Sequence, residues 1–299
     1  MAILKKTVIG ISTLALALSA ACATTSKLPR SSYTSGYNGS NLLVSEQEKE
    51  KALESVEQIV LTQKWAIDNE ECKGYPYYLP DEYDEQMFGS AVVVHEDETS
   101  CYLLTANHVV DYSPNFILAN CGYTVGLPDI EIAGKDLKVE VVYKDMALDF
   151  AYIKTEKTDK LHKAKIGNSD KLKQDKFVYA IGYSLALDKY ITSGHVTATR
   201  SAYYSQPTNS IIYLDDEFTF DAAISPGNSG GPVFAANGAM LEVVGLAVAS
   251  YHPYGQNLNI AVKINDIIDQ IKYYEYWENI NYKNAFDDVE DEILNLDWK

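Results

Sequence analysis

Short hydrophobic runs separated by turn residues dominate the chain from position 88 to position 262. The runs are rich in β-branched and aromatic residues, and Gly, Pro, Asn and Asp stand between them, a pattern typical of β-strands joined by turns. Two groups of about six such runs, with no long helical pattern between them, predict an all-β fold of two consecutive six-stranded antiparallel barrels, at about 87–166 and 175–262. The expected strands are 90–94, 101–105, 115–119, 137–144 and 149–154, then 177–181, 190–199, 211–214, 218–223, 232–235, 243–250 and 258–262.

The segments on either side of these runs carry a helical pattern. Residues 46–64 and 264–272 place apolar side chains at helical spacing among polar ones, which predicts a helix at each end of the barrels. Within 46–86 the first helix leads into an acidic, Tyr-rich loop, and residues 273–299 form an acidic tail with a further helical pattern. The apolar positions are Leu53, Val56, Ile59 and Val60, then Ile264, Ile267, Ile268 and Ile271.

The first 21 residues are typical of a secretory signal peptide. Lys5 and Lys6 precede an apolar run that ends in small residues, a pattern of export rather than of a spanning helix. The stretch from Leu18 to Cys22 resembles a bacterial lipobox, which would make Cys22 a lipidated residue, although the family usually has Leu, Val or Ile where Ser19 stands. Ordinary cleavage after Ala23 is the alternative. Residues 22–45, rich in Ser, Thr, Gly and Asn, predict a flexible tether.

Composition narrows the partners that the chain can have. The 299 residues carry a formal net charge of −17, and 46% of them are hydrophobic. Such an acidic globular protein gains nothing from a phosphate backbone, so nucleic acid is not expected as a partner. Beyond the signal no apolar run is long enough for a membrane helix, so contact with a membrane is expected only through a lipid at Cys22.

The cysteines allow one disulfide in an exported chain. Cys72, Cys101 and Cys121 remain after Cys22. We favour Cys101 with Cys121, because that bridge would tie down the segment around His108; three unpaired, buried cysteines are the alternative.

The segment Pro226-Gly227-Asn228-Ser229-Gly230-Gly231-Pro232 carries the strongest chemical signal. A nucleophilic serine must project into a cleft beside backbone N–H groups that can bind a developing oxyanion, and glycines permit the tight backbone this needs. Ser229 is therefore the candidate nucleophile, and the N–H groups of Gly227 and Ser229 are the candidate oxyanion donors.

A serine needs a general base, and the base needs an orienting carboxylate. His108 follows the hydrophobic strand 101–105 through a small-residue turn, which places an imidazole at the rim of a barrel, and His252 is a weaker rival. Asp149 opens an apolar strand, where a carboxylate needs a partner. Asp145, in an expected turn, is its rival.

Residues 88–272 resemble the trypsin-like peptidases of bacteria, particularly the protease domain of the HtrA/Deg group. The matching pieces are 88–92, 104–110, 149–151, 166–169, 180–183 and 221–232, in the order that the family has them. The resemblance implies a chymotrypsin-like double barrel in a peptidase domain at 87–272, a triad of His108, Asp149 and Ser229, hydrolysis of protein or peptide substrates, and no metal or cofactor.

The resemblance also locates the primary specificity pocket. Ala223, six residues before the serine, lies at the base of that pocket in the family, and Val248 and Ala249 are expected to line its walls. With no carboxylate there, we expect a small-to-medium aliphatic side chain before the cleaved bond. The chain departs from the family at Ala91, where a glycine is usual, and it has no recognisable PDZ domain or trimer-forming segment.

Two other function classes remain open. A protease fold that serves only as a binding module of the cell envelope is the main rival, although all three triad residue types are present. A structural or adhesion lipoprotein would fit the Tyr-rich acidic ends but leaves the Ser229 motif unexplained.

Overall fold

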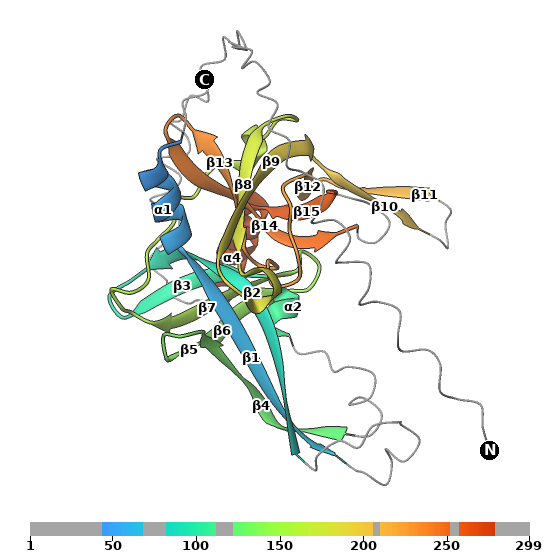
Figure 1. The fold of residues 1–299 in the computed structure, drawn as a ribbon. Coiled ribbons are helices and arrows are strands. Elements are labelled where there is room, and N and C mark those ends of the chain that lie inside the picture. The colour runs from blue at the N-terminus through green and yellow to red at the C-terminus, as the bar shows by residue number, and fades with distance from the viewer. Residues whose placement is uncertain (1–43, 68–81, 112–121, 206–209, 252–256, 279–299) are drawn as a thin grey trace, which may run out of the picture. The chain divides into compact units, whose positions relative to one another are not determined.

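The structure is a computed structural model, and it describes residues 44–67, 82–111, 122–205, 210–251 and 257–278. These residues belong to one compact unit, residues 42–299 (Figure 1). Its first half contains α1 (Glu46–Glu54), β1 (Val56–Ile67), β2 (Glu82–Glu96), β3 (Ser100–Thr105), α2 (Asn107–Val110), β4 (Gly122–Ile132), β5 (Leu137–Lys138), β6 (Glu140–Asp145) and β7 (Phe150–Glu156). Its second half contains η2 (Ser169–Lys171), β8 (Phe177–Gly182), η3 (Ser184–Ala186), β9 (Tyr190–Ala198), β10 (Ser201–Ser205), β11 (Ser210–Leu214), β12 (Glu217–Phe220), β13 (Pro232–Asn237), β14 (Met240–Ser250), β15 (Asn259–Lys263) and α4 (Ile264–Glu278).

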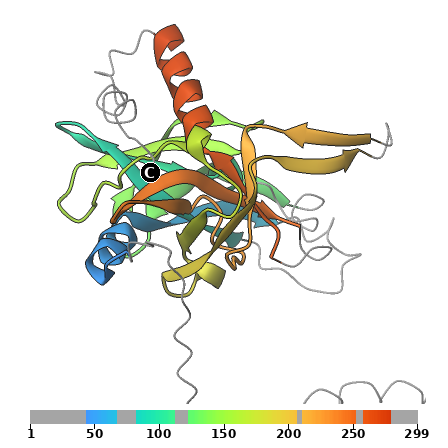
Figure 2. The same ribbon diagram turned by 90° about the horizontal axis from the view of Figure 1, so that it is seen from above.

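The all-β prediction of two successive β-units is confirmed, with a difference in the first unit. The second unit is a closed barrel in the order β12-β15-β14-β13-β8-β9. The first, over the strands that the structure describes, is an antiparallel sheet of seven strands in the order β5-β4-β1-β2-β3-β7-β6, without the closure of the second. Strands β10 and β11 leave the second barrel as a separate two-stranded sheet that projects from it (Figures 1 and 2).

The predicted helix over 46–64 is wrong beyond Glu54. Ser55 ends α1, with its hydroxyl donating to the Ala52 carbonyl, and the chain then runs as β1 between β2 and β4. In β1 the side chains of Ile59, Leu61, Gln63 and Trp65 are all buried, so the segment alternates with a period of two. The first unit therefore begins at Val56 rather than at position 87, and β-branched residues explain why this segment prefers a strand.

Two apolar clusters form the core. One fills the second barrel around Phe218, Phe220 and Val233. The other lies against the first sheet and also takes in side chains from the second barrel, such as Phe234 and Leu246, so the two units share buried surface.

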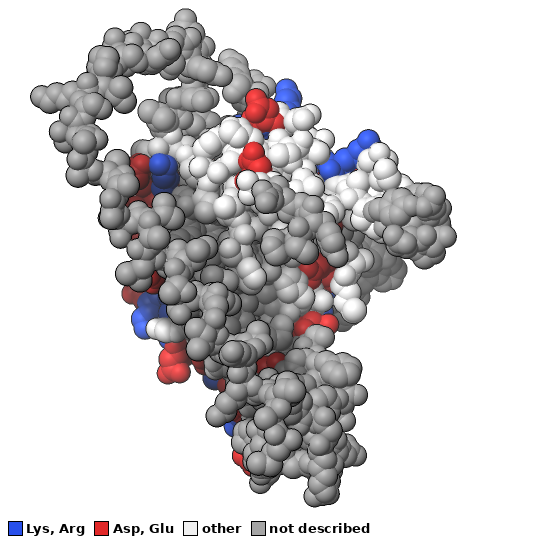
Figure 3. All heavy atoms as spheres, turned by 45° about the vertical axis from the view of Figure 1, so that its right-hand side comes forward, with Lys and Arg blue, Asp and Glu red and all other residues white. Residues whose placement is uncertain are grey.

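The predicted closing helix is confirmed as α4. Its four isoleucines, at 264, 267, 268 and 271, are buried in the shared cluster, and each such burial stabilises the fold by about 1.5–3 kcal/mol. None of the helices that the structure describes is both long enough and apolar enough to cross a bilayer. On the face in Figure 3 the described acidic and basic side chains are scattered among uncharged ones rather than gathered in one patch.

Candidate active site

The segment before Ser229 forms a tight turn that only glycine fits. Asn228 N–H donates to the Ser225 carbonyl at 3.0 Å, and Gly227 between them has a φ of +96°. A Pro-Gly pair inside such an i to i+3 hydrogen bond is typical of a type II turn, whose third residue needs a positive φ. A Cβ atom on Gly227 would also lie 2.2 Å from the Tyr183 carbonyl oxygen. The turn therefore requires glycine for its backbone angle and for its close contact.

The buried hydroxyl of Ser90 fastens this turn to the first sheet. It donates to the Gly227 carbonyl at 2.7 Å and accepts the Tyr183 N–H at 2.9 Å. The Ser90 N–H donates in turn to the Ser229 carbonyl at 2.8 Å. In the sequence, Ser90 counted only as part of the family-like segment 88–92. The one signal for its role as an anchor of the turn was the position of a serine within an otherwise apolar strand.

A second contact sets the orientation of the peptide unit between Pro226 and Gly227. The Leu185 N–H donates to the Pro226 carbonyl at 2.6 Å. In a planar trans peptide the N–H points opposite to the C=O. The Gly227 N–H therefore points away from η3, and its direction is determined by Leu185.

His108 and Asp149 are joined by two hydrogen bonds. Nδ1 of His108 lies 2.7 Å from Oδ2 of Asp149, and the backbone N–H of His108 donates to Oδ1 at 3.0 Å. Because a carboxylate only accepts, the contact assigns a proton to Nδ1, and in the neutral imidazole Nε2 is then the acceptor. The side chains are 45% and 32% exposed, so the pair is open to a substrate.

Backbone geometry supports this pair. Asp149 precedes β7 with a φ of +52°, in the left-handed region that Asp tolerates better than most residues, and its carbonyl accepts the Asn107 N–H at 3.1 Å. The rival Asp145 instead accepts the N–H groups of Ala147 and Leu148 in a turn. His252, the rival base, lies outside the described residues.

The structure brings the segment of Ser229 next to that of His108. Gly89 lies between them: a Cβ atom there would be 2.4 Å from the Val109 side chain and 3.1 Å from the Ser229 carbonyl. Ser229 Oγ and the His108 ring, both of them described, make no hydrogen bond with each other; in free enzymes such catalytic contacts are often long and tighten when substrate binds.

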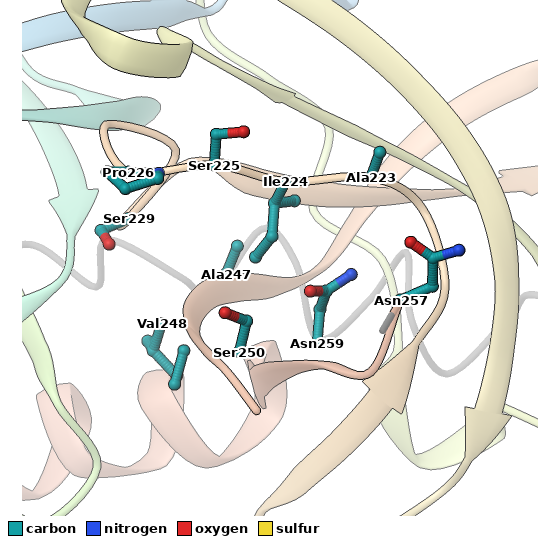
Figure 4. Close-up of a pocket in the computed structure, with 11 residues that line it drawn as sticks. Ala223, Ile224, Ser225, Pro226, Ser229, Ala247, Val248, Ser250, Asn257 and Asn259 are labelled. Atoms are coloured by element: carbon teal, nitrogen blue, oxygen red, sulfur yellow. The ribbon is translucent and has the colours of Figure 1, made fainter. Parts of the chain in front are cut away.

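A cavity of about 670 Å³ opens beside Ser229. The expected residues Ala223, Val248 and Ala249 all line it. Figure 4 shows Ser229 at one end, Asn257 at the other and Asn259 between them; sequence reasoning did not assign these two amides to the pocket. The remaining lining residues are Ile224, Ser225, Pro226, Ala247 and Ser250.

The expected disulfide between Cys101 and Cys121 is not supported by the structure. Cys101 is a free thiol with 0% exposure, on a strand that is paired along both edges with β2 and β7. Its side chain is part of the apolar core of the first sheet, where it behaves as a small hydrophobic residue. Cys22, Cys72 and Cys121 lie outside the described residues, as do the expected strand 115–119, the signal peptide and the tether up to position 43.

The chain is similar to known peptidases. Residues 89–246 match a family described as the trypsin-like peptidase domain. A probable periplasmic serine protease do/HhoA-like from Haemophilus influenzae is 34% identical over 176 residues, which cover 59% of this chain and 34% of that protein. A probable periplasmic serine endoprotease DegP-like from Rhizobium meliloti is 32% identical over 188 residues, covering 61% and 33%.

The similarity extends to solved structures. The HtrA-type protease AlgW with decapeptide aligns with a TM-score of 0.53 at 22% identity, over 75% of this chain and 65% of that one, which is a likeness of fold. The matched part of the chain spans about a third of the length of the curated relatives.

Proposed function

The chain belongs to the trypsin-like peptidase family, and we propose that it is a serine endopeptidase that works through His108, Asp149 and Ser229. The observation that carries this proposal is the two-point hydrogen bonding of His108 by Asp149, beside a glycine turn that presents Ser229. The relatives support serine peptidase chemistry for the family. The assignment of that chemistry to His108, Asp149 and Ser229 rests on the contacts of these residues.

In the proposed reaction, Nε2 of His108 removes the proton of the Ser229 hydroxyl as Oγ attacks the scissile carbonyl. Asp149 holds the Nδ1–H tautomer and stabilises the imidazolium that forms. The N–H groups of Gly227 and Ser229 bind the oxyanion, and the loss of one such donor costs about 10²–10³ in rate. His108 then protonates the leaving amine, and water hydrolyses the acyl-enzyme.

The cavity beside Ser229 supports a small-to-medium aliphatic side chain before the cleaved bond. Ala223, Val248 and Ala249 give it apolar walls, and none of its described lining residues is charged. Asn259 donates from its Nδ2 to the Ala222 carbonyl at 2.7 Å, so one of its two N–H donors is already engaged. Replacing Ala223→Asp should shift a peptide-library profile towards Arg and Lys; a profile dominated by Arg, Lys or Glu in the unmodified protein would contradict the proposal.

The relatives are named periplasmic, and this fits the signal peptide predicted from residues 1–21. We therefore place the enzyme in the bacterial cell envelope, acting on protein or peptide substrates, with lipidation of Cys22 as the proposed means of attachment to a membrane.

Labelling with a fluorophosphonate probe tests the proposal. The probe should label the wild-type protein and neither Ser229→Ala nor His108→Ala, with all three shown to be folded by circular dichroism. A folded wild-type protein that resists the probe yet still binds peptides would instead be a non-catalytic binding module.

A further inference from the structure

The charged side chains of Glu57, Lys135 and Lys189 lie near one another, with Lys189 over the Tyr183 ring, and none of them takes part in the proposed chemistry. Glu57, at the start of β1, is only 2% exposed and pairs with Lys135 at 2.7 Å. Lys189, just before β9, is partly buried, and this burial lowers the pKa of its ammonium group, an effect that nearby Glu57 opposes. Burying a charged group costs free energy unless the group has hydrogen-bonding or charged partners, so the partners of Lys189 show what its position in the fold provides.

The ammonium group of Lys189 binds the C-terminal end of α1. Its Nζ donates to the Leu53 carbonyl at 2.6 Å, in the last turn of the helix. The last carbonyls of a helix lack intrahelical partners and carry a partial negative charge, which a cation stabilises. The same ammonium group lies 5.5 Å from the centre of the Tyr183 ring, within the range of a cation–π contact.

Lys189 thus ends a loop whose other end supports the oxyanion turn. Tyr183 begins this loop, and its carbonyl lies against Gly227. Leu185 donates its N–H to the Pro226 carbonyl and so orients the Gly227 N–H. Leu185 and Ala186 both have a φ of +55°, a conformation that non-glycine residues rarely keep unless the surroundings hold it.

Helix α1 is itself anchored to the second barrel. Oε1 of Glu48 accepts the Leu241 N–H at 3.3 Å, and Nζ of Lys49 lies 5.9 Å from the Tyr179 ring. Ala52 is buried. The helix therefore offers a fixed point to which Lys189 can hold the strained loop.

We propose that Lys189 is a positioning residue for catalysis: by joining the end of α1 to the loop 183–189, it keeps the Leu185 N–H on Pro226 and the Gly227 N–H directed for oxyanion binding. This inference rests on the proposed function of the same site. It gives α1 a role in positioning the oxyanion turn, through its contact with Lys189.

The test compares Lys189→Met, which keeps the aliphatic stem, with Lys189→Arg, which restores a donor. Lys176→Met is the matched control, because Lys176 is also half-buried and donates to a backbone carbonyl, that of Ala236, at 2.7 Å. Lys189→Met should lower kcat for a peptide substrate roughly tenfold with KM nearly unchanged, less than the ~10²–10³ expected for loss of a whole oxyanion donor. Lys189→Arg should recover most of the rate, and the control should keep it. A wild-type kcat in Lys189→Met, or an equal loss in Lys176→Met, would overturn the inference.

Amide hydrogen exchange in a Ser229→Ala background separates this inference from the proposed function, because it needs no activity. Adding Lys189→Met should speed exchange in peptides that cover 183–190 and 225–231, and adding Lys176→Met should not. If the wild-type protein lacks peptidase activity, the proposed function is wrong. The exchange rates of the peptides that cover 183–190 and 225–231 would still show whether Lys189 holds the turn in place. Unchanged exchange in an active enzyme would refute the role of Lys189 alone.

Discussion

Replacing Gly227→Ala should abolish most of the activity while leaving the protein folded. The new Cβ atom would lie 2.2 Å from the Tyr183 carbonyl oxygen, 0.8 Å short of the 3.0 Å that real Cβ contacts respect. The turn that carries the proposed oxyanion donor, or the loop at Tyr183 that lies against it, must therefore move by about that amount. Misplacement of a catalytic group by ~1 Å costs about 10² in rate, and loss of an oxyanion donor costs about 10²–10³. We expect kcat to fall by about 10²–10³.

Gly238→Ala is the matched control for this change. Gly238 lies in the hairpin turn between β13 and β14 with a φ of +59°, and no atom lies within 4 Å of a Cβ placed there. A left-handed backbone costs an alanine about 1–2 kcal/mol at either position, so both variants should lose stability, but only Gly227→Ala carries the clash as well. Urea denaturation measures the first effect, and steady-state cleavage of a fluorogenic peptide measures the second. If folded Gly227→Ala kept kcat within about threefold of the control, the assignment of its N–H to the oxyanion site would be wrong.

Three further changes test other parts of the site and its surroundings. Asp149→Asn should lower kcat by about 10⁴ without altering circular dichroism, because an amide cannot hold the productive tautomer of His108. A loss of kcat below tenfold would contradict the assignment of Asp149 as the residue that orients His108. Ser90→Ala leaves the partly buried Tyr183 N–H and Gly227 carbonyl without their partner, so it should lower the free energy of unfolding by about 1 kcal/mol or more and reduce kcat; unchanged values of both would remove Ser90 from the site. Burial raises the pKa of Asp97, but hydrogen bonds from Thr99, Tyr102 and Ser100 outweigh it and lower that pKa to about 2. The stability that Asp97 adds is thus present above its ordinary pKa of 3.8 and is lost as the pH falls towards 2, so the difference in Tm between wild type and Asp97→Asn should shrink over that range; a difference independent of pH would contradict it.

Local patterns accounted for the second barrel and for α4. Strands such as β8 and β13 carry their own turn residues and β-branched side chains, and the four isoleucines of α4 face one side of a helix. The segment 46–64 was harder, because apolar residues at positions 53, 56, 59 and 60 fit a helix as well as a strand until the partners β2 and β4 are known. Closure of the first sheet likewise depends on the pairing of distant edges, which no local pattern contains.

For the site, the sequence by itself determined the candidate groups: the glycine-flanked Ser229, a histidine after a strand and an aspartate before one, in a consistent chain order. Only the tertiary structure decided what holds those groups in place. Ser90 contacts Gly227, which lies 137 positions further along the chain, and Lys189 contacts Leu53, which lies 136 positions before it. Cys101 lies in the core as a free thiol. Residue type and spacing reveal groups that carry chemistry, because a reaction demands particular atoms. Supporting contacts demand only a donor or acceptor at the right point in space, and many residue types at many positions can supply one.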